Sequence, residues 1–498
     1  MRRPWMPLIC CLLSLTLAAP VWAEDAPSPP RAFERLQFPS LPPLQRPDYV
    51  EFQLANGLRV YLIEDHRLPL VSGSLLIRTG SRLDPPGQGG LADFTAELLR
   101  SGGSQRYPRE ALNRWLETRA ADIESDMGTA AGTVGFSGLA TDLSPLLATT
   151  LDLVRHPVFP QDRLDLLKQQ YRGAIARQND KPESIVRREF PKLVYGAQSP
   201  YAAEVTLTDL DRIRRSDLID FHRRYYQPQR MILGLVGDFD AARVKAELQQ
   251  LTADWSAGTT RDLPIPSARQ VNASGLWLVD RPQQNQSYVQ MGQLGDRFSD
   301  PDFPALSVLN EVLNGFGGRL YNQVRSRQGL AYSVYSRWQP AFDYPGLFVA
   351  GAQTRTETTA ELIRAIRAQL ELVRREPISD RELSEAKERV LNTFIFNFQT
   401  PAQTLSRLLR YAYYGYPADQ LFRYQKQVAA VTVADVQRVA RQRIRPDRLV
   451  TLVVGNGAAL KAPLASLELG PVQALSLEPT TPAAAPPAAA VPRRGDRE

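Results

Sequence analysis

Cysteine and histidine are scarce in this chain of 498 residues. Both cysteines, Cys10 and Cys11, lie near the N-terminus, so loss of that segment would leave no thiol. A mature chain of that kind excludes disulfide bonds, thiolate zinc sites, iron–sulfur clusters and cysteine nucleophiles. The three histidines, His66, His156 and His222, lie far apart in the sequence, so every short two-histidine zinc motif is absent.

Lysine is also rare, and this bears on possible partners. The chain has 60 basic residues, of which 7 are lysines, and a formal net charge of +7. The basic residues form no long block and no cluster with aromatic residues, so we expect no nucleic-acid partner. No segment beyond the N-terminus has about 18 uninterrupted apolar residues, which predicts no membrane span in the mature chain.

The N-terminus carries the pattern of an export signal. Arg2 and Arg3 precede an apolar run over residues 6–19, and a small-residue cleavage site ends at Ala23. This layout predicts a cleavable signal peptide over residues 1–23, because the run is too short for an ordinary membrane span. We therefore expect a periplasmic protein.

The rest of the chain is long enough for more than one core, and its two halves repeat each other. Lys168 pairs with Lys387, and Pro182 with Pro401, at an offset of 219. Four further pairs, at an offset of 218, are Asp217 with Asp435, Pro228 with Pro446, Arg230 with Arg448 and Gly237 with Gly455. Matches at a nearly constant offset indicate a tandem duplication.

Composition and periodicity then predict the order of the segments. Strand-like runs stand at the two ends of each half with helical patterns between them, which predicts an α+β fold with helices packed on a sheet. The predicted segments are a Pro-rich arm (24–48), a first domain (49–256), a linker (257–274), a second domain (275–460) and a disordered Pro/Ala-rich tail (461–498).

Two stretches of the first half carry a recognisable pattern, Phe52 to Tyr61 and Gly90-Leu-Ala-Asp-Phe-Thr-Ala-Glu97. The first resembles the first strand of the M16 (pitrilysin/insulinase-like) metallopeptidase family, and the second resembles that family's zinc helix, which reads approximately G-x-A-H-F-x-E-H. The resemblance spans roughly residues 50–457. It implies two homologous domains, each a mostly antiparallel sheet packed with helices, that form half of a clamshell closing around a peptide.

The catalytic positions of that family are altered here. Asp93 stands in place of the first histidine ligand, Ala96 in place of the general-base glutamate, and Glu97 in place of the second histidine. The family's third ligand, a glutamate before an acidic-x-Pro turn, corresponds to Ala174. All four positions therefore lack the expected residue, and the resemblance implies no zinc bound by this chain.

Three interpretations of Asp93 and Glu97 remain open. At a spacing of i,i+4 the two carboxylates share one helix face. They form a solvated acidic pair on a helix that has lost its catalytic use, or they hold a hard ion such as Ca²⁺ weakly with further oxygen ligands. Unorthodox catalysis is the third interpretation, although position 96 offers no base for a metal-bound water.

The second half keeps the other signature of the family. The stretch from Gly317 to Tyr332 resembles S-R-L-x-x-x-[LV]-R-x-x-x-G-L-x-Y, and Arg325 and Tyr332 match the arginine and tyrosine that reach the zinc site of the opposing domain. A guanidinium and a phenol suit hydrogen bonding to a substrate carbonyl and to its oxyanion. The alternative is a local salt bridge of Arg325 and a strand that begins at Tyr332. Arg319 is expected to stabilise the turn after the preceding helix.

This asymmetry predicts the function. We expect a non-catalytic subunit of an exported heterodimeric M16 zinc peptidase, which supplies Arg325 and Tyr332 to the zinc site of an HxxEH partner that hydrolyses unfolded peptides. The chain itself would bind no cofactor, and the zinc would lie in the partner. The alternative functions are a catalytically silent peptide-binding or scaffold subunit and an active hydrolase that uses Asp93 and Glu97.

Overall fold

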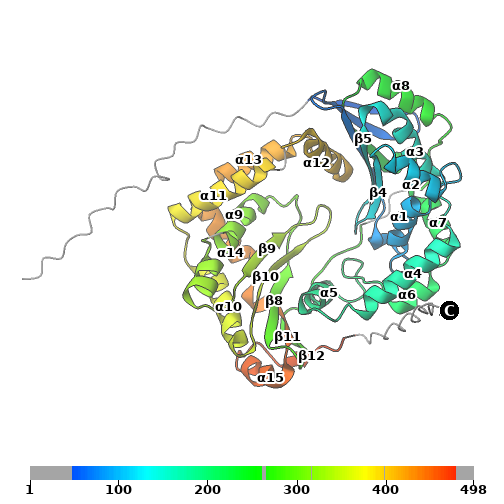
Figure 1. Ribbon diagram of the computed structural model, residues 1–498. Helices are drawn as coiled ribbons and strands as arrows, with labels where there is room; N and C mark the ends of the chain where they lie inside the picture. The colour runs from blue at the N-terminus through cyan, green and yellow to red at the C-terminus, as the bar shows by residue number, and fades with distance from the viewer. Residues whose placement is uncertain (1–47, 261–264, 316, 397–398, 478–498) are drawn as a thin grey trace, which may run out of the picture. The chain divides into compact units, whose positions relative to one another are not determined.

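Each half of the protein contains one six-stranded sheet. The computed structural model describes residues 48–260, 265–315, 317–396 and 399–477, with the side chains of residues 394 and 395 excepted (Figure 1). The predicted signal peptide and all but the last residue of the Pro-rich arm lie outside the described residues.

The first sheet has the strand order β1-β2-β6-β3-β5-β4, in which only β2 and β6 are parallel. Its strands are β1 (Val50–Gln53), β2 (Arg59–Glu64), β3 (Leu70–Ile77), β4 (Asp122–Met127), β5 (Gly132–Leu139) and β6 (Met231–Gly237). The helices of this half are α1 (Leu91–Ser101), α2 (Arg109–Glu117), α3 (Leu143–Arg155), α4 (Gln161–Ala176), α5 (Pro182–Tyr195), α6 (Leu207–Arg212), α7 (Arg215–Tyr225) and α8 (Ala241–Leu251).

The second sheet has the order β12-β7-β11-β8-β10-β9, in which β7 is parallel to both β11 and β12. Its strands are β7 (Gly275–Asp280), β8 (Gln286–Leu294), β9 (Val334–Gln339), β10 (Leu347–Arg355), β11 (Val450–Gly455) and β12 (Val472–Ala474). The helices are α9 (Phe303–Asn314), the π-helical turn η5 (Tyr321–Arg327), α10 (Thr359–Arg375), α11 (Asp380–Ile395), α12 (Pro401–Tyr414), α13 (Gln420–Ala430), α14 (Val433–Arg443) and α15 (Gly457–Ala465).

The duplication predicted from the sequence is visible in equivalent contacts. Lys168 Nζ donates to the carbonyl oxygen of Ile213 at 2.5 Å, and Lys387 Nζ donates to that of Val431 at 3.0 Å. Lys168 thus ties α4 to the residue before the N-cap of α7, and Lys387 ties α11 to the residue before the N-cap of α14. Two mostly antiparallel sheets packed with helices confirm the predicted α+β fold.

The central strands β6 and β11 are buried at every position, so each sheet must be covered on both faces. One face of each sheet packs against helices of its own half. The opposite face packs against a helix of the other half: α12 covers the first sheet, and α5 covers the second (Figure 1). These helices begin at the repeat pair Pro182 and Pro401, so the two halves exchange equivalent helices.

The exchanged helices pack closely enough to require glycine beneath them. Leu409 of α12 is fully buried, and a Cβ atom added at Gly234 of β6 would lie 2.6 Å from its Cδ1. Alternate residues of β2 divide between the two faces: Leu62 joins the core under the first half's own helices, and Tyr61 and Ile63 join the cluster under α12. Both faces of this strand therefore carry part of the core.

The prediction of a disordered tail from residue 461 onward is wrong for residues 461–477. Helix α15 continues to Ala465, and β12 adds an edge strand to the second sheet. Leu475 N then donates to Leu278 O at 2.9 Å, and the side chains of Leu475 and Leu477 pack against the cluster beneath α5. Burial of these leucines stabilises an ordered end, and residues 478–498 lie outside the described residues.

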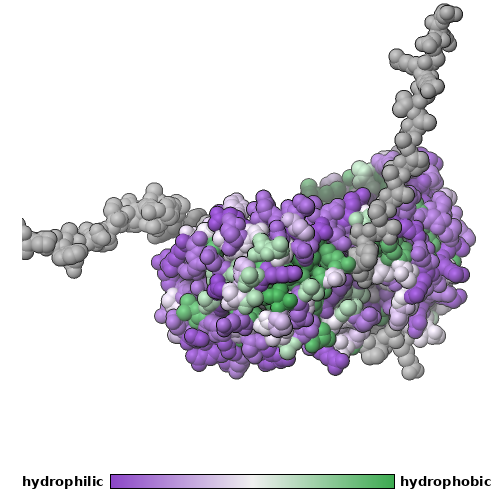
Figure 2. Space-filling model, turned by 90° about the horizontal axis from the view of Figure 1, so that it is seen from below, coloured by the Kyte–Doolittle hydropathy of each residue, from purple (hydrophilic) through white to green (hydrophobic). Residues whose placement is uncertain are grey.

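The surface gives no sign of a spanning helix in the part of the chain that the structure describes. None of its helices combines the length and the apolar character needed to cross a membrane. Figure 2 shows one face of the molecule, on which hydrophobic residues form patches between hydrophilic ones.

Candidate functional site

Helix α1 carries three of the four positions that the resemblance aligns with the family's catalytic residues, and a half-buried carboxylate fixes its beginning. Asp84 accepts hydrogen bonds from the backbone N–H groups of Gly90 and Ala92, both at 2.8 Å. Gly90 has φ of 90°, a backbone conformation that favours glycine. Burial raises the pKa of Asp84 to about 7, although the two backbone hydrogen bonds lower it. The side chain of Asp84 thus replaces the cap that Gly90 cannot supply.

The three positions on α1 differ in their surroundings. Asp93 is half-buried, and burial raises its pKa to about 6, with further contributions from the negative charges of Asp126 and Glu204. Ala96 is 2% exposed and presents only a methyl group. Glu97 is exposed on the same helix. The helix therefore offers one half-buried and one exposed carboxylate, with no base between them.

The fourth position lies on α4, which packs beside α1. Ala174 is exposed there, and three residues earlier Tyr171 makes an edge-on ring contact with Phe94 of α1, with 4.7 Å between ring centroids. Burial, together with the negative charges of Asp93 and Glu97, raises the pKa of Tyr171 to about 12. Aromatic packing therefore joins the two helices at this place, next to the two carboxylates.

These residues do not fit a zinc ion. Within the described ranges, no group of three or more His, Cys, Asp and Glu side chains is arranged to hold a metal. His66 pairs with Asp238, with 2.7 Å between Nδ1 and Oδ1. His222 is half-buried, with 2.7 Å between its Nε2 and the carbonyl oxygen of Val154, and burial lowers its pKa to about 4. Zinc needs imidazole or thiolate ligands that this helix pair does not provide.

Arg325 and Tyr332 lie in direct contact. The guanidinium carbon of Arg325 lies 4.6 Å from the ring centroid of Tyr332 and 4.9 Å from that of Tyr321. Such distances allow cation–π attraction to both rings. Tyr332 is 84% exposed, which is unusual for a large aromatic residue. The pair is therefore assembled at the surface.

The backbone around this pair is held by local contacts. Leu330 N donates to Val324 O at 2.9 Å, and Gly329 between them has φ of 59°. The guanidinium of Arg319 donates to both carboxylate oxygens of Glu382, at 2.7 and 3.1 Å. This bidentate pairing holds the pKa of Glu382 at about 2, against the effect of burial. Arg319 thus ties the segment before η5 to the start of α11.

The structure brings together the members of each predicted set but shows no contact between the sets. Asp93 and Glu97 share α1, and Arg325 contacts Tyr332. No hydrogen bond, ion pair or ring contact within the described residues joins the carboxylates to the Arg325–Tyr332 pair. Sequence reasoning did not identify Tyr321, although its position four residues before Arg325 on one helical face was a usable signal.

Comparison with protein families gives two adjacent matches. The model described as "Insulinase (Peptidase family M16)" matches residues 59–203, and the model described as "Peptidase M16 inactive domain" matches residues 212–390. Together these ranges cover more than half of the chain. The second description refers to a domain, and that domain carries Arg325 and Tyr332.

Individual relatives agree with these matches. A protein of Bacillus subtilis named "Uncharacterized zinc protease YmxG" is 23% identical over 81% of this chain and 97% of its own length. A Helicobacter pylori protein named "Non-peptidase homolog YmxG" is 22% identical over 81% of this chain and 94% of its own. Proteins named as proteases and as non-peptidases thus resemble this chain to a similar degree.

Solved structures show the same fold. The crystal structure of a peptidase M16 inactive domain from Pseudomonas fluorescens has a TM-score of 0.74 and 25% identity, and the match covers 82% of this chain and 98% of that one. The periplasmic protease PqqL from Escherichia coli has a TM-score of 0.69 and 15% identity, and the match covers 82% of this chain and 45% of that one. On the strength of these matches and of its two sheets, the chain belongs to the M16 peptidase family.

Proposed function

We propose that this protein is the non-catalytic subunit of an exported heterodimeric M16 zinc peptidase. Its partner supplies an HxxEH zinc site, and this chain supplies Arg325 and Tyr332 to that site. The observation that carries the proposal is the contact of Arg325 with an 84% exposed Tyr332, in a chain whose own metal positions lack ligands and base.

The residues at the four altered positions also lack the chemistry that a zinc peptidase needs. Hydrolysis by a zinc peptidase needs a bound water and a base that takes its proton. The buried methyl group of Ala96 stands where that base is expected, and Ala174 stands where a carboxylate ligand is expected. Asp93 is partly protonated near pH 6, because burial raises its pKa, and this weakens any attraction for a cation. These features support a chain that is inactive alone.

The retained half has the geometry of a preorganised donor site. Tyr321 and Tyr332 flank the Arg325 guanidinium, which restricts its rotamers before any substrate arrives. In a partner's site the guanidinium and the Tyr332 hydroxyl would donate hydrogen bonds to the substrate carbonyl, and these bonds would strengthen as negative charge develops on its oxygen. Removal of one such donor typically lowers kcat by about 10²–10³-fold.

The cell compartment and the substrate follow from other features. The sequence pattern of residues 1–23 supports export. The substrate is an unfolded peptide, which would add to the edge of a sheet by main-chain hydrogen bonds.

A reconstitution experiment tests this proposal. The purified chain is mixed with its HxxEH partner and zinc, and hydrolysis of a quenched unstructured peptide is followed, with each subunit alone for comparison. We expect activity in the mixture only, about 10²-fold lower for Arg325→Ala and reduced for Tyr332→Phe. Arg327→Ala is the matched control, because Arg327 is exposed on the same turn η5 and forms no ion pair among the described residues.

Two outcomes would contradict the proposal. Activity that is indifferent to Arg325→Ala and Tyr332→Phe in a stable complex would favour a silent peptide-binding or scaffold subunit. The name of the H. pylori relative, a non-peptidase homolog, favours this second candidate. Chelator-sensitive activity of this chain alone, lost on Asp93→Asn or Glu97→Gln, would instead favour unorthodox catalysis.

A further inference from the structure

A cavity of about 380 Å³ lies between the linker, the end of β8 and the turn after α14. Its volume falls within the range of small-molecule sites in proteins. Four arginines line it, Arg269, Arg443, Arg445 and Arg448, and a single carboxylate, Asp296. None of the residues that line the cavity belongs to the Arg/Tyr motif, and the proposed function does not use the cavity.

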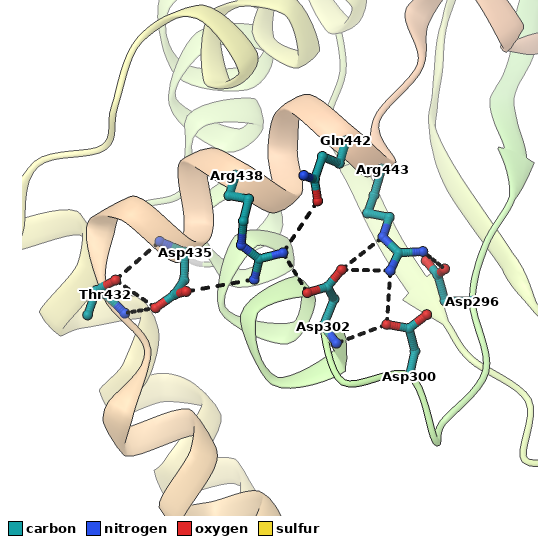
Figure 3. Close-up of polar contacts among 8 residues, drawn as sticks. All are labelled: Asp296, Asp300, Asp302, Thr432, Asp435, Arg438, Gln442 and Arg443. Carbon is teal, nitrogen blue, oxygen red and sulfur yellow. Dashed lines mark hydrogen bonds and ion pairs between the residues drawn. The ribbon is translucent and has the colours of Figure 1, made fainter.

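One of the four arginines is fully engaged with carboxylates (Figure 3). The guanidinium of Arg443 lies 2.7 Å from Asp296, 3.1 Å from Asp300 and 2.6 Å from Asp302. Asp302 also accepts from Arg438 at 2.7 Å. Arg443 is therefore occupied, and its one positive charge is shared by three carboxylates, of which Asp296 lines the cavity.

The backbone that carries the other arginines is held by two glutamines. The buried side chain of Gln293 accepts from Arg445 N at 2.9 Å and donates to Arg443 O at 2.8 Å. Gln270 of the linker donates to Arg448 O at 2.9 Å. The positions from which these guanidinium groups extend are thus fixed, which reduces the entropy lost when a ligand binds.

The remaining three arginines have no partner for their charge. Arg269, Arg445 and Arg448 are exposed, and their guanidinium groups form no hydrogen bond or ion pair within the described ranges. Like charges around one cavity repel each other and create a positive potential that attracts anions.

The repeat shows that Arg448 has been freed from a structural role. Its equivalent in the first half, Arg230, is 5% exposed, and its guanidinium donates to the carbonyl oxygen of Arg78. Arg230 thus joins the start of β6 to the end of β3, two neighbouring strands inside the first sheet. In the second half the same position faces solvent beside the cavity, so the fold does not need the charge of Arg448.

We propose that this cavity binds a phosphate compound that carries at least two negative charges, with a diphosphate as the simplest case. A ligand with a single carboxylate would offset the charge of only one of the three guanidinium groups. Each presents two parallel N–H donors that match phosphate oxygens. The cavity is also larger than one phosphate group, and Arg269 belongs to the linker while Arg445 and Arg448 belong to the second half. The anion therefore bridges these two segments.

Calorimetric titration of the full chain with inorganic pyrophosphate at low ionic strength tests the proposal. We expect saturable binding at one site, about tenfold weaker for Arg445→Ala or Arg448→Ala and weakened further by salt. Arg243→Ala is the matched control, because Arg243 is exposed on α8 and its side chain forms no ion pair with any residue that the structure describes. Melting curves of each variant without ligand establish that all are folded.

The outcomes are distinguishable. Equal weakening by Arg243→Ala, absence of saturable binding, or binding of citrate as tight as that of pyrophosphate would overturn the proposal. Cosedimentation with phosphatidic acid vesicles, lost in the Arg445 and Arg448 variants, would assign the phosphate to a lipid head group. Pyrophosphate binding without cosedimentation would assign it to a free phosphate compound.

Discussion

The helix exchange makes a specific prediction about Leu409. This residue belongs to the second half by sequence, but its fully buried side chain packs on Gly234 in the central strand of the first sheet. Replacement of a buried leucine by alanine removes its transfer free energy and leaves a cavity, at a cost of about 3 kcal/mol. Leu409→Ala should therefore destabilise the protein by this amount in chemical denaturation.

Hydrogen exchange locates where that stability is lost. In the Leu409→Ala variant, we expect faster exchange of the backbone amides of β6, which lies in the other half of the chain. The matched control is Leu370→Ala, because Leu370 is also fully buried but belongs to the second half's own core. That control should lose similar stability and expose β8 and β10. Faster exchange confined to the second sheet in Leu409→Ala would refute the exchange of helices.

Three further predictions concern other parts of the molecule. Arg82→Ala leaves the carboxylate of Asp343 buried and unpaired where the two halves meet. We therefore expect the free energy of unfolding, measured in urea, to fall by about 3 kcal/mol, and a fall below about 1 kcal/mol would contradict this. The pKa of Asp93 is raised to about 6, so the folded chain binds more protons than the unfolded chain, and stability falls as pH rises from 3.8 to 6. Asp93→Asn should lack this fall and melt at a higher temperature than the wild type above pH 6, and equal pH profiles would show that Asp93 is not perturbed. Gly329→Ala introduces a side chain at a backbone φ of 59°. We expect about 1 kcal/mol of destabilisation and lower activity in the reconstituted complex. An unchanged melting temperature would argue against a strained turn before Tyr332.

Much of the fold was predictable because duplication repeats its signals. The apolar runs that become β6 and β11 are recognisable as buried strands, and the lysine pair at positions 168 and 387 makes equivalent contacts. Strands β4 and β5 were not predicted. β4 has a single buried side chain, that of Ile123, and β5 contains Gly132, Gly135 and Gly138, which lower strand propensity.

Other features needed three-dimensional information. Helix α9 was not predicted because it is buried on nearly all sides, which removes the amphipathic period. The exchange of α5 and α12 leaves no trace in the sequence, since equivalent helices would bury the same residues on either sheet. At the candidate site, the altered positions 93, 96, 97 and 174 were readable from the resemblance. The spacing of Tyr321 and Arg325 was also readable, but the contact of the ring with the guanidinium depends on side-chain orientation and needed the structure.

The reciprocal packing of α5 and α12 also has an evolutionary consequence. A gene for one half, before duplication, would have encoded a sheet with one face left uncovered and a helix with no sheet of its own to cover. Two copies could solve both problems by donating that helix to each other, as in a domain-swapped homodimer. Fusion of the two copies would then preserve the swap within one polypeptide. One copy's site was afterwards free to change without loss of the scaffold, since each half still depends on the other for its fold.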